Sequence, residues 1–266
     1  MKWTIYHTGL FKKIVMHVKE LSRMVTLEYC RTALVIKAFA AFNQSYADIY
    51  IPCEFLARAE NVADDEGVLL RQGRVTIDIT HLYRALKSCA CTDTIELVMV
   101  DAPRTTLLRT TFVRQQRRQT FMIQCQKSER QCSLLPLDHD TRFTVSCDSF
   151  HATMLQLADI VHVVKLELSE ATSPKEELHI RGASDEVEVH CRLPARILCG
   201  GATEHRDACH LGRFDMHTLL EVVHFCTLSL NGEVQLNSSP DLPLKLLFSL
   251  PGNGRVTLML GSSRHR

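Results

Sequence analysis

The sequence predicts an α+β protein of two duplicated domains, each with antiparallel sheets and two short helices. Three observations support this prediction. Apolar and polar residues alternate along most of the 266-residue chain, which is typical of strands with one buried face. Four short segments change to helical spacing. The order of strands and helices then repeats after about 140 residues, a period that indicates a duplicated domain and not a solenoid.

The alternating segments predict strands in both halves of the chain. In the N-terminal half they are residues 3–6, 49–51, 75–79, 95–100 and 121–123, with a loop expected over 57–73. In the C-terminal half they are residues 143–145, 163–168, 178–180, 187–189, 234–236, 244–248 and 256–260. Pro251-Gly-Asn-Gly254 separates the last two strands, and a Gly-rich tetrapeptide at such a place predicts a hairpin.

Helical spacing appears at residues 9–23, 80–88, 148–160 and 216–225. In the first segment the apolar side is formed by Leu10, Ile14, Val18 and Leu21. Thr80 is the expected N-cap of the second helix, and Asp148 or Ser149 that of the third, because short polar side chains accept hydrogen bonds from the first turn.

Two alignments of the chain with itself show the repeat. A shift of 137 places Ile77-Asp-Ile-Thr-His-Leu82 over Phe214-Asp-Met-His-Thr-Leu219, and it matches Cys89 with Cys226. A shift of 140 places Trp3 over Phe143. A chain of this length accommodates two domains of about 130 residues. We therefore expect domains at 1–126 and 142–266, joined by a mainly polar linker at 127–141.

Charge divides unevenly between the halves. Residues 1–126 contain 17 Lys and Arg against 12 Asp and Glu, a net charge of +5, and residues 127–266 contain 14 against 18, a net charge of −4, which together give the +1 of the chain. A basic half indicates a surface for a polyanion, although chance asymmetry between solvated surfaces explains it equally well.

The cations of the basic half gather on its two expected helices. The exposed sides carry Lys12, Lys13, His17, Lys19 and Arg23 on the first helix, and His81, Arg84 and Lys87 on the second. Such faces bind phosphates without reading sequence, but an ordinary solvated face is the alternative. No aromatic residue interleaves with these cations, so stacking on single strands is not expected. The third and fourth helices carry neutral or acidic faces with Asp148, His151, Gln156, Asp159, His217, Glu221 and His224.

Signatures of catalysis or metal binding are weak. Cys191, Cys199, His205, Cys209 and His210 cluster in the sequence, but their separations do not match a paired zinc knuckle. The sequence contains no phosphate-binding loop, dinucleotide fingerprint or nucleophile elbow. We expect no catalytic residue, no metal and no cofactor.

The remaining composition bears on the compartment. Eleven cysteines without framework spacing favour reduced thiols in the cytosol or nucleus. The first seven residues show no signal-peptide core, and no apolar run approaches the roughly 18 residues of a membrane span.

Duplicated halves with two short helices each resemble the DNA sliding clamp family, whose best-known member is the replicative clamp PCNA. Three local matches are most similar to the Hus-type subunit, one of three different chains in the checkpoint clamp known as the nine-one-one ring. They are Met1-Lys-Trp3, Leu82-Tyr-Arg-Ala-Leu-Lys87 with Thr94-Ile-Glu-Leu97 after it, and Phe214-Asp-Met-His-Thr-Leu-Leu220.

The resemblance implies a ring of two other clamp subunits and this chain, with helices lining a hole for double-stranded DNA. The DNA-facing residues would be Lys12, Lys13, Lys19, Arg23, Arg84 and Lys87. An ATP-driven clamp loader would open the ring, and the checkpoint kinase machinery would respond to it. The protein would catalyse no reaction, and it would work in the nucleus, with the cytoplasm as a second location.

Departures from the replicative clamp leave two rivals. The linker is polar until Leu134-Leu-Pro-Leu137, and the last residues, Leu258-Met-Leu-Gly-Ser-Ser-Arg-His-Arg266, lack a recognisable Tyr/Leu/Ala/Pro tail. A homotrimeric replicative processivity clamp is thus the nearer alternative. A metal-dependent enzyme using the Cys/His loop 191–210 is the alternative from another class.

Overall fold

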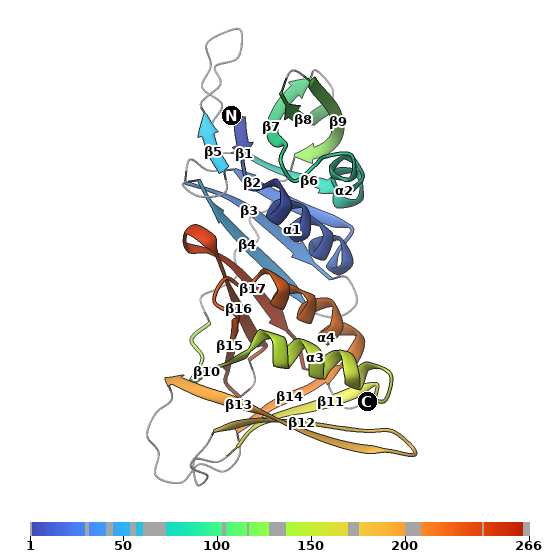
Figure 1. Cartoon of the computed structure of the whole chain (residues 1–266), viewed down its shortest axis with the longest axis vertical. Helices are drawn as coiled ribbons and strands as arrows, with labels where there is room; N and C mark the ends of the chain where they lie inside the picture. Colours follow the sequence, from blue (N-terminus) through green and yellow to red (C-terminus); the bar gives the residue numbers. More distant parts are fainter. Residues whose placement is uncertain are drawn as a thin grey trace. The chain divides into compact units, whose positions relative to one another are not determined.

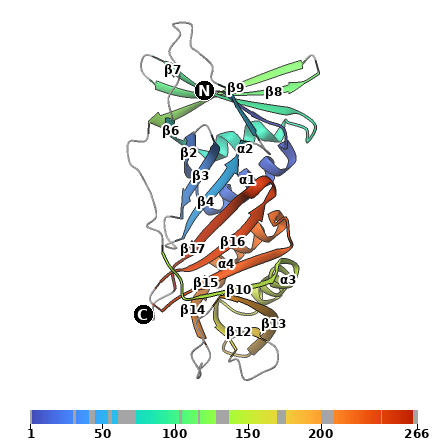
Figure 2. The same cartoon turned by 90° about the vertical axis from the view of Figure 1, so that its left-hand side faces the viewer.

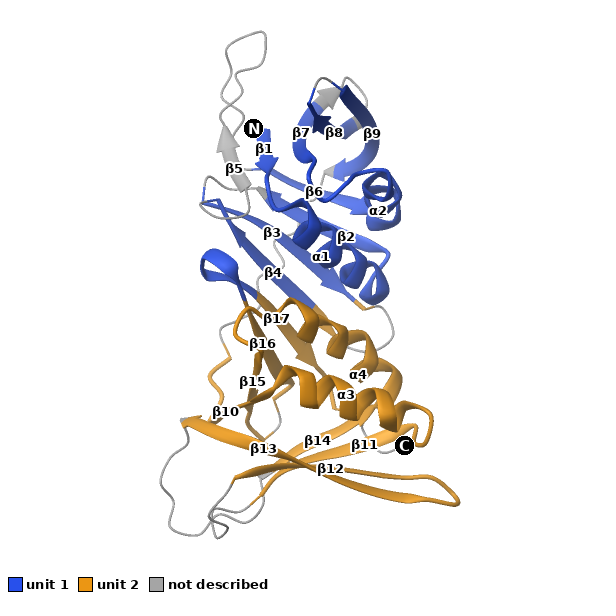
Figure 3. Ribbon diagram, in the orientation of Figure 1, with its two compact units in different colours: residues 1–39, 47–133, 250–255 blue, residues 40–46, 134–249, 256–266 orange. Residues whose placement is uncertain are grey.

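The structure, a computed structural model, describes residues 2–29, 32–40, 45–53, 57–60, 73–102, 105–115, 117–127, 137–169, 176–199, 209–240 and 242–262. The chain forms two compact units (Figure 3). Unit 1 contains Met1–Phe39, Ala47–Ser133 and Leu250–Arg255, and unit 2 contains Ala40–Tyr46, Leu134–Ser249 and Val256–Arg266. Most of the expected linker, residues 128–136, lies outside the described residues, and the domain limits at 126 and 142 stay a prediction.

The first half of the chain contains two helices and nine strands among its described residues. In order they are β1 (Lys2–Ile5), α1 (Thr8–Leu21), β2 (Met24–Tyr29), β3 (Ala33–Phe39), β4 (Tyr46–Pro52), β5 (Ala57–Glu60), β6 (Gly73–Asp78), α2 (Ile79–Lys87), β7 (Thr94–Ala102), β8 (Thr105–Arg114) and β9 (Arg117–Lys127). The antiparallel pairings give the order β5–β1–β7–β8–β9, and β6 joins β9 to β2 and β3.

The second half repeats this plan. Its elements are β10 (Thr141–Ser146), α3 (Cys147–Ala158), β11 (Val163–Leu168), β12 (Glu177–Ala183), β13 (Glu188–Cys199), β14 (Cys209–Asp215), α4 (Met216–Val223), the 3₁₀ turn His224–Leu228, β15 (Glu233–Ser238), β16 (Leu244–Leu250), the 3₁₀ turn Pro251–Asn253 and β17 (Gly254–Leu260). The strand order is β16–β15–β10–β13–β12–β11–β14, all antiparallel. Figure 2 shows β16, β15 and β10 side by side.

The pairings confirm the duplication. β1 lies between β5 and β7 as β10 lies between β13 and β15, and β2 lies between β3 and β6 as β11 lies between β12 and β14. In each unit the two helices contact each other, α1 with α2 and α3 with α4 (Figure 1). Trp3 and Phe143, matched by the shift of 140, are both completely buried.

The helix starts confirm the repeat and correct the expected caps. The Asp78 carboxylate accepts a hydrogen bond from the Thr80 N–H, and the Asp215 carboxylate accepts from His217 and Thr218, so two residues matched by the shift of 137 are both N-caps. Thr80 is therefore not the cap of α2. The cap of α3 is Ser146 and not Asp148 or Ser149, because the helix begins at Cys147, before the expected start.

The expected strands are present within a few residues, but several strands were not expected. β3, β8, β14 and most of β13 lack a clear alternation, because apolar or threonine-rich runs hide which face is buried. β2 does alternate, with Val25 and Leu27 buried, but it was not predicted from the sequence. β5 contradicts the expected loop over 57–73 at residues 57–60, since pairing with β1 extends this short charged segment. In the described ranges no helix is long and apolar enough to cross a membrane.

Candidate nucleic-acid interface

Helix α1 buries one side and leaves a stripe of cations on the other. Phe11, Ile14, Val15, Val18 and Leu21 are buried, and this apolar face fixes the helix in unit 1. At 100° per residue, positions 12, 16 and 19 share the opposite direction, with position 13 beside them. His17, expected on the exposed side, is only 6% exposed. It lies next to the buried Ile14 and Leu21, three residues before it and four after it on the helix, which explains this correction.

Lys12 lies in this stripe but is engaged inside unit 1. Its Nζ donates a hydrogen bond to the Cys89 carbonyl at 2.5 Å, and the side chain is half-buried. The bond ties α1 to the segment that follows α2. The ammonium group is therefore fixed at the edge of the helix pair instead of extending freely into solvent.

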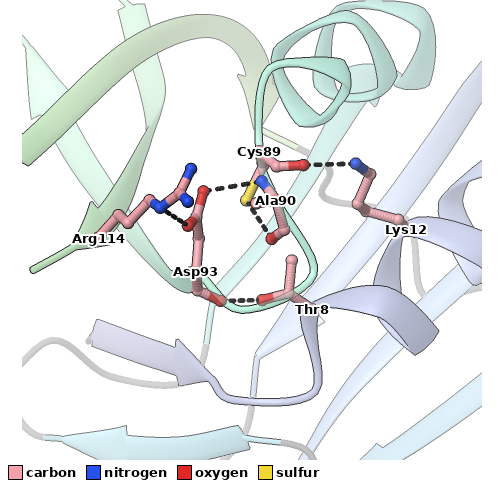
Figure 4. Close-up of polar contacts among 6 residues, drawn as sticks. All are labelled: Thr8, Lys12, Cys89, Ala90, Asp93 and Arg114. Atoms are coloured by element: carbon pink, nitrogen blue, oxygen red, sulfur yellow. Dashed lines mark hydrogen bonds and ion pairs between the residues drawn. The ribbon is translucent and has the colours of Figure 1, made fainter.

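A small network around Asp93 holds the same segment in place (Figure 4). The Thr8 hydroxyl donates to the Asp93 carbonyl at 2.5 Å, and the Ala90 N–H donates to the Asp93 carboxylate at 2.8 Å. Arg114 of β8 approaches this carboxylate with its Nε at 3.8 Å. These contacts position the N-terminus of α1 against the end of α2, and so they set the spacing of the two cationic helices.

Arg23 follows the end of α1 and pairs with the start of α2. Its side chain is 80% exposed, and its Nε lies 2.7 Å from the carboxylate of Asp78, the α2 cap. Burial favours a higher pKa for Asp78, but the hydrogen bonds from Arg23 and Thr80 outweigh it and lower the pKa to about 2. One carboxylate thus caps α2 and links the two helices.

Lys19, Tyr83 and Lys87 form a cation–aromatic cluster across the helix pair. The Lys19 and Lys87 ammonium groups lie 4.7 and 5.1 Å from the centre of the Tyr83 ring. Lys19 also forms an ion pair with Glu20 at 2.9 Å, and the hydrogen bond from this pair raises the Lys19 pKa. The expectation that no aromatic residue lies among these cations was wrong, because Tyr83 of α2 reaches the α1 cation across the contact.

Lys13, Arg84 and Lys87 are the cations of the set most available to a ligand. All three are exposed, as is His81. Within the described part of the chain, Lys13 and Arg84 take part in no ion pair. The six predicted residues are thus brought to one helix pair, where Lys13, Arg23, Arg84 and Lys87 are exposed and Lys12 and Lys19 are half-buried. Whether they meet DNA stays a prediction.

The helix pair of unit 2 differs in charge. Asp148, Gln156 and Asp159 are exposed on α3, and His217 is exposed on α4 with its Nε2 3.6 Å from Glu221. His151 and His224 are half-buried with their rings edge to face. The expected neutral to acidic character of this pair is confirmed, so the two units present unlike helix surfaces.

Sequence reasoning missed a second group of cations on β8 and β9. Arg109, Arg117 and Arg118 are exposed, and Arg109 and Arg118 lie on the strand face opposite the buried Leu108 and Ile123. The signal was present as Arg114-Gln-Gln-Arg-Arg118, but its place on a hairpin depended on recognising β8.

The metal hypothesis has no support in the described residues, where no group of three or more His, Cys, Asp and Glu side chains could hold a metal ion. Cys191 lies on β13, and Cys209 and His210 begin β14. Residues 200–208, including His205, lie outside the described ranges. The Cys/His loop as a whole thus stays untested.

The Asp78–Arg23 pair predicts a pH dependence of stability. Because folding lowers the Asp78 pKa from 3.8 to about 2, the pair stabilises the fold above pH 4 and its contribution disappears as pH falls through 2. The contribution is at most about 2 kcal/mol, reduced by solvent around the exposed Arg23.

Asp78→Asn, which keeps a capping side chain, tests this expectation. The difference in urea unfolding free energy between wild type and Asp78→Asn should shrink between pH 4 and pH 2. Asp215→Asn is the control, because the described structure shows no ion pair for this equivalent cap. A difference that is independent of pH at Asp78 would contradict the linkage.

Comparisons with known proteins identify the fold. No family model matches the sequence, and no curated protein matches it. The structure is similar to a PCNA2–PCNA3 complex from Sulfolobus tokodaii, with a TM-score of 0.76 and 16% identity over 98% of each chain. It is also similar to the Proliferating Cellular Nuclear Antigen of Entamoeba histolytica, with a TM-score of 0.77 and 16% identity over 99% of this chain and 98% of that one. The chain therefore has the PCNA-like clamp fold, as the sequence predicted.

Proposed function

We propose that this chain is a non-catalytic subunit of a heterotrimeric ring that encircles duplex DNA in damage checkpoint signalling and repair. The single observation that carries the proposal is the cationic helix pair α1–α2 on a clamp fold. Lys13, Arg84 and Lys87 are exposed on this pair, and the ion pairs and hydrogen bonds of Lys12, Lys19 and Arg23 hold its geometry. Such a surface contacts the phosphates of DNA of any base sequence, as a clamp that moves along DNA requires.

The charge difference between the units favours unlike partners. In a ring of three copies of this chain, half of the helix pairs would carry the acidic α3–α4 surface. Two different subunits could supply more basic surfaces around the DNA. The Sulfolobus tokodaii structure contains two different PCNA chains, which shows that this fold can assemble from unlike chains in that protein.

The finer assignment rests on the Hus-type sequence matches. It implies two other clamp subunits, an ATP-driven loader and the checkpoint kinase machinery as partners. It also implies a nuclear location, with the cytoplasm as a second one. Tagging this chain in its own cells and naming the co-purifying proteins by mass spectrometry tests these partners together, and fluorescence of the tagged chain tests the location.

The homotrimeric replicative clamp remains the second candidate, because the Entamoeba histolytica protein has the same fold. Sedimentation of the pure chain separates the two. A homotrimer would sediment near three times 30.2 kDa, whereas a heterotrimeric subunit should not form this species without its partners. A stable homotrimer of the pure chain would overturn the checkpoint proposal.

Charge reversal tests the DNA-facing surface. Complexes that contain this chain are recovered through a tag on it. They are then loaded onto nicked circular duplex DNA in cell extract supplied with ATP, and the DNA is washed with buffers of increasing salt concentration. Wild-type complexes should stay on circles and leave when the DNA is linearised. Lys13→Glu with Arg84→Glu should reduce retention and lower the log–log salt slope by roughly 0.9 for each phosphate that the variant no longer neutralises.

Arg109→Glu with Arg118→Glu is the matched control. It also reverses two exposed cations, but they lie on β8 and β9, on the strand face opposite the buried Leu108 and Ile123. It should leave retention and the salt slope unchanged. Weak retention of this control together with normal retention of the helix variant would place the DNA on the β8–β9 strands and contradict the assignment to α1 and α2.

A further inference from the structure

Two arginines and two histidines form a square on the paired strands β12 and β13 of unit 2. The strand register places Arg181 opposite His190 and His179 opposite Arg192. The two imidazole rings meet edge to face with their centres 5.1 Å apart. Arg181, His190 and Arg192 are exposed, and His179 is half-buried. Partial burial, followed by the nearby Arg181 and Arg192, lowers the pKa of His190. We call these four residues the arginine–histidine array.

The array lies on the sheet face that is turned away from the core of unit 2. Ile180 and Gly182, on either side of Arg181 in the sequence, belong to the opposite face and are buried. A Cβ added to Gly182 would lie 2.8 Å from a methyl carbon of Val161, in the segment between α3 and β11. Figure 1 shows α3 and α4 together on one side of this sheet. The array is therefore on the side opposite the helix pair of unit 2.

Two more cations extend the array across the sheet. Lys165 of β11 lies opposite Arg181, and Arg213 of β14 lies opposite Lys165. Glu167 of β11 pairs with Lys165 and, at 3.4 Å, with Arg181. The Glu167 side chain is only 11% exposed, against 36% for Lys165 and 49% for Arg181, so a ligand meets mainly the cations. Among the described residues, Arg192 takes part in no ion pair.

The fold does not require these cations. Two positions before the carboxylate that recurs on the central strand, unit 1 has Thr26 where unit 2 has Lys165. Thr26 lies opposite Thr76, and their hydroxyls are 3.2 Å apart, whereas Lys165 lies opposite Arg213. Like charges directly opposite each other destabilise a sheet. The cations of unit 2 thus have a structural cost, which an anionic ligand would offset.

The extent of the array fits a single phosphate group. Glu177 and Glu188 lie two residues before His179 and His190 on the same face, so carboxylates border the array at both ends along the strands. A long polyanion that followed the strands would meet these carboxylates. One phosphate stays between them and accepts paired hydrogen bonds from guanidinium groups.

We propose that the arginine–histidine array binds a phosphorylated serine or threonine in a segment of a partner protein, with Arg181 and Arg192 donating to the phosphate oxygens. Clusters of arginine are a general means of recognising phosphorylated segments. Lys165 lies beside the array and would pair with an acidic residue of the same segment. The choice of a protein and not DNA rests on the proposed function, in which the helices on the other side of the sheet face the DNA.

Fluorescence anisotropy with the full chain, or with complexes recovered through its tag, tests the proposal. The probe is a labelled peptide with one phosphoserine among glycine and glutamate residues, and its unphosphorylated form is the ligand control. The phosphorylated form should bind at least about tenfold more tightly. Equal binding of the two forms would overturn the proposal.

Variants locate the site. Arg181→Gln with Arg192→Gln should weaken binding of the phosphorylated peptide by about tenfold or more. Arg142→Gln with Arg196→Gln is the matched control, because it removes the same charge from β10 and from β13 outside the array. It should bind like wild type. Equal loss of binding in both variants would show a general effect of charge and overturn the proposal.

Labelling of wild-type arginines with phenylglyoxal gives a second measurement, which does not depend on the folding of a variant. The bound phosphopeptide should protect Arg181 and Arg192, while Arg142 and Arg196 continue to react. If Arg181 and Arg192 react as in the free chain, or if short duplex DNA protects them at lower concentration than the peptide, the proposal is overturned. Neither measurement involves ring assembly, so a chain that binds the peptide but forms no ring would contradict the proposed function alone.

Discussion

Glu28→Ala is expected to lower the free energy of unfolding of unit 1 by about 2–3 kcal/mol. The Glu28 carboxylate lies between Lys37 of β3 and Arg74 of β6, at 2.9 Å from the Lys37 Nζ and 2.8 Å from the Arg74 Nε. Lys37 is only 8% exposed. Removing the carboxylate takes a close counter-charge from an ammonium that water reaches poorly, which costs more than the loss of an exposed ion pair.

Urea unfolding followed by the fluorescence of Trp3 measures this change, because Trp3 is the single tryptophan and is buried in unit 1. The double variant Glu28→Ala with Lys37→Met should recover much of the stability, since it removes the buried charge as well. A double variant as unstable as Glu28→Ala would show that packing and not charge is responsible.

Unit 2 supplies the matched control. Glu167 of β11 pairs with Lys165 and, at 3.4 Å, with Arg181, so the carboxylate recurs on the equivalent strand. Here the side chains of Lys165 and Arg181 are 36% and 49% exposed. Water can replace the carboxylate, and Glu167→Ala should cost only about 1 kcal/mol. Circular dichroism follows this variant, because unit 2 has no tryptophan.

Asp93→Ala is expected to cost roughly 1–3 kcal/mol, because it leaves the half-buried Ala90 N–H without its acceptor. Asp93→Asn keeps an acceptor oxygen and should cost less than about 1 kcal/mol, since it removes only the long ion pair with Arg114, which is 65% exposed. Trp3 fluorescence again reports the unfolding of unit 1.

Hydrogen exchange gives an independent measure of the Asp93 network. The Ala90 amide should exchange faster in Asp93→Ala and at nearly the wild-type rate in Asp93→Asn. If Asn costs as much as Ala, the carboxylate charge and not the hydrogen bond holds the segment after α2, which would contradict the expectation.

The repeat was the part of the fold that the sequence could predict best. Both halves bury the same alternating strand faces, so the matched residues Trp3 and Phe143 both lie in the core. The matched residues Asp78 and Asp215 are both N-caps of the helix that follows. Periodicity also found the four helices within a few residues. Strands such as β3 and β8 were not predicted, because a segment without alternating apolar and polar residues does not show which of its faces is buried.

The sequence predicted which residues belong to the candidate site, but not which contacts their side chains make. Helical spacing alone collected Lys12, Lys13 and Lys19 on one helix. That Lys12 bonds to the Cys89 carbonyl and Lys19 lies over Tyr83 depends on how α1 packs against α2. Such contacts join residues more than 60 positions apart, beyond the reach of any local pattern.

By itself, the sequence determined the α+β class, the duplication and the cationic character of one helix pair, because periodicity and charge are properties of short segments. The tertiary structure decided which cations remain available and where His17 points. Arg23 and Asp78 are 55 residues apart and carry no sequence motif. Only the pairing of β2 with β6 brings their side chains to 2.7 Å, because it places the end of α1 beside the start of α2.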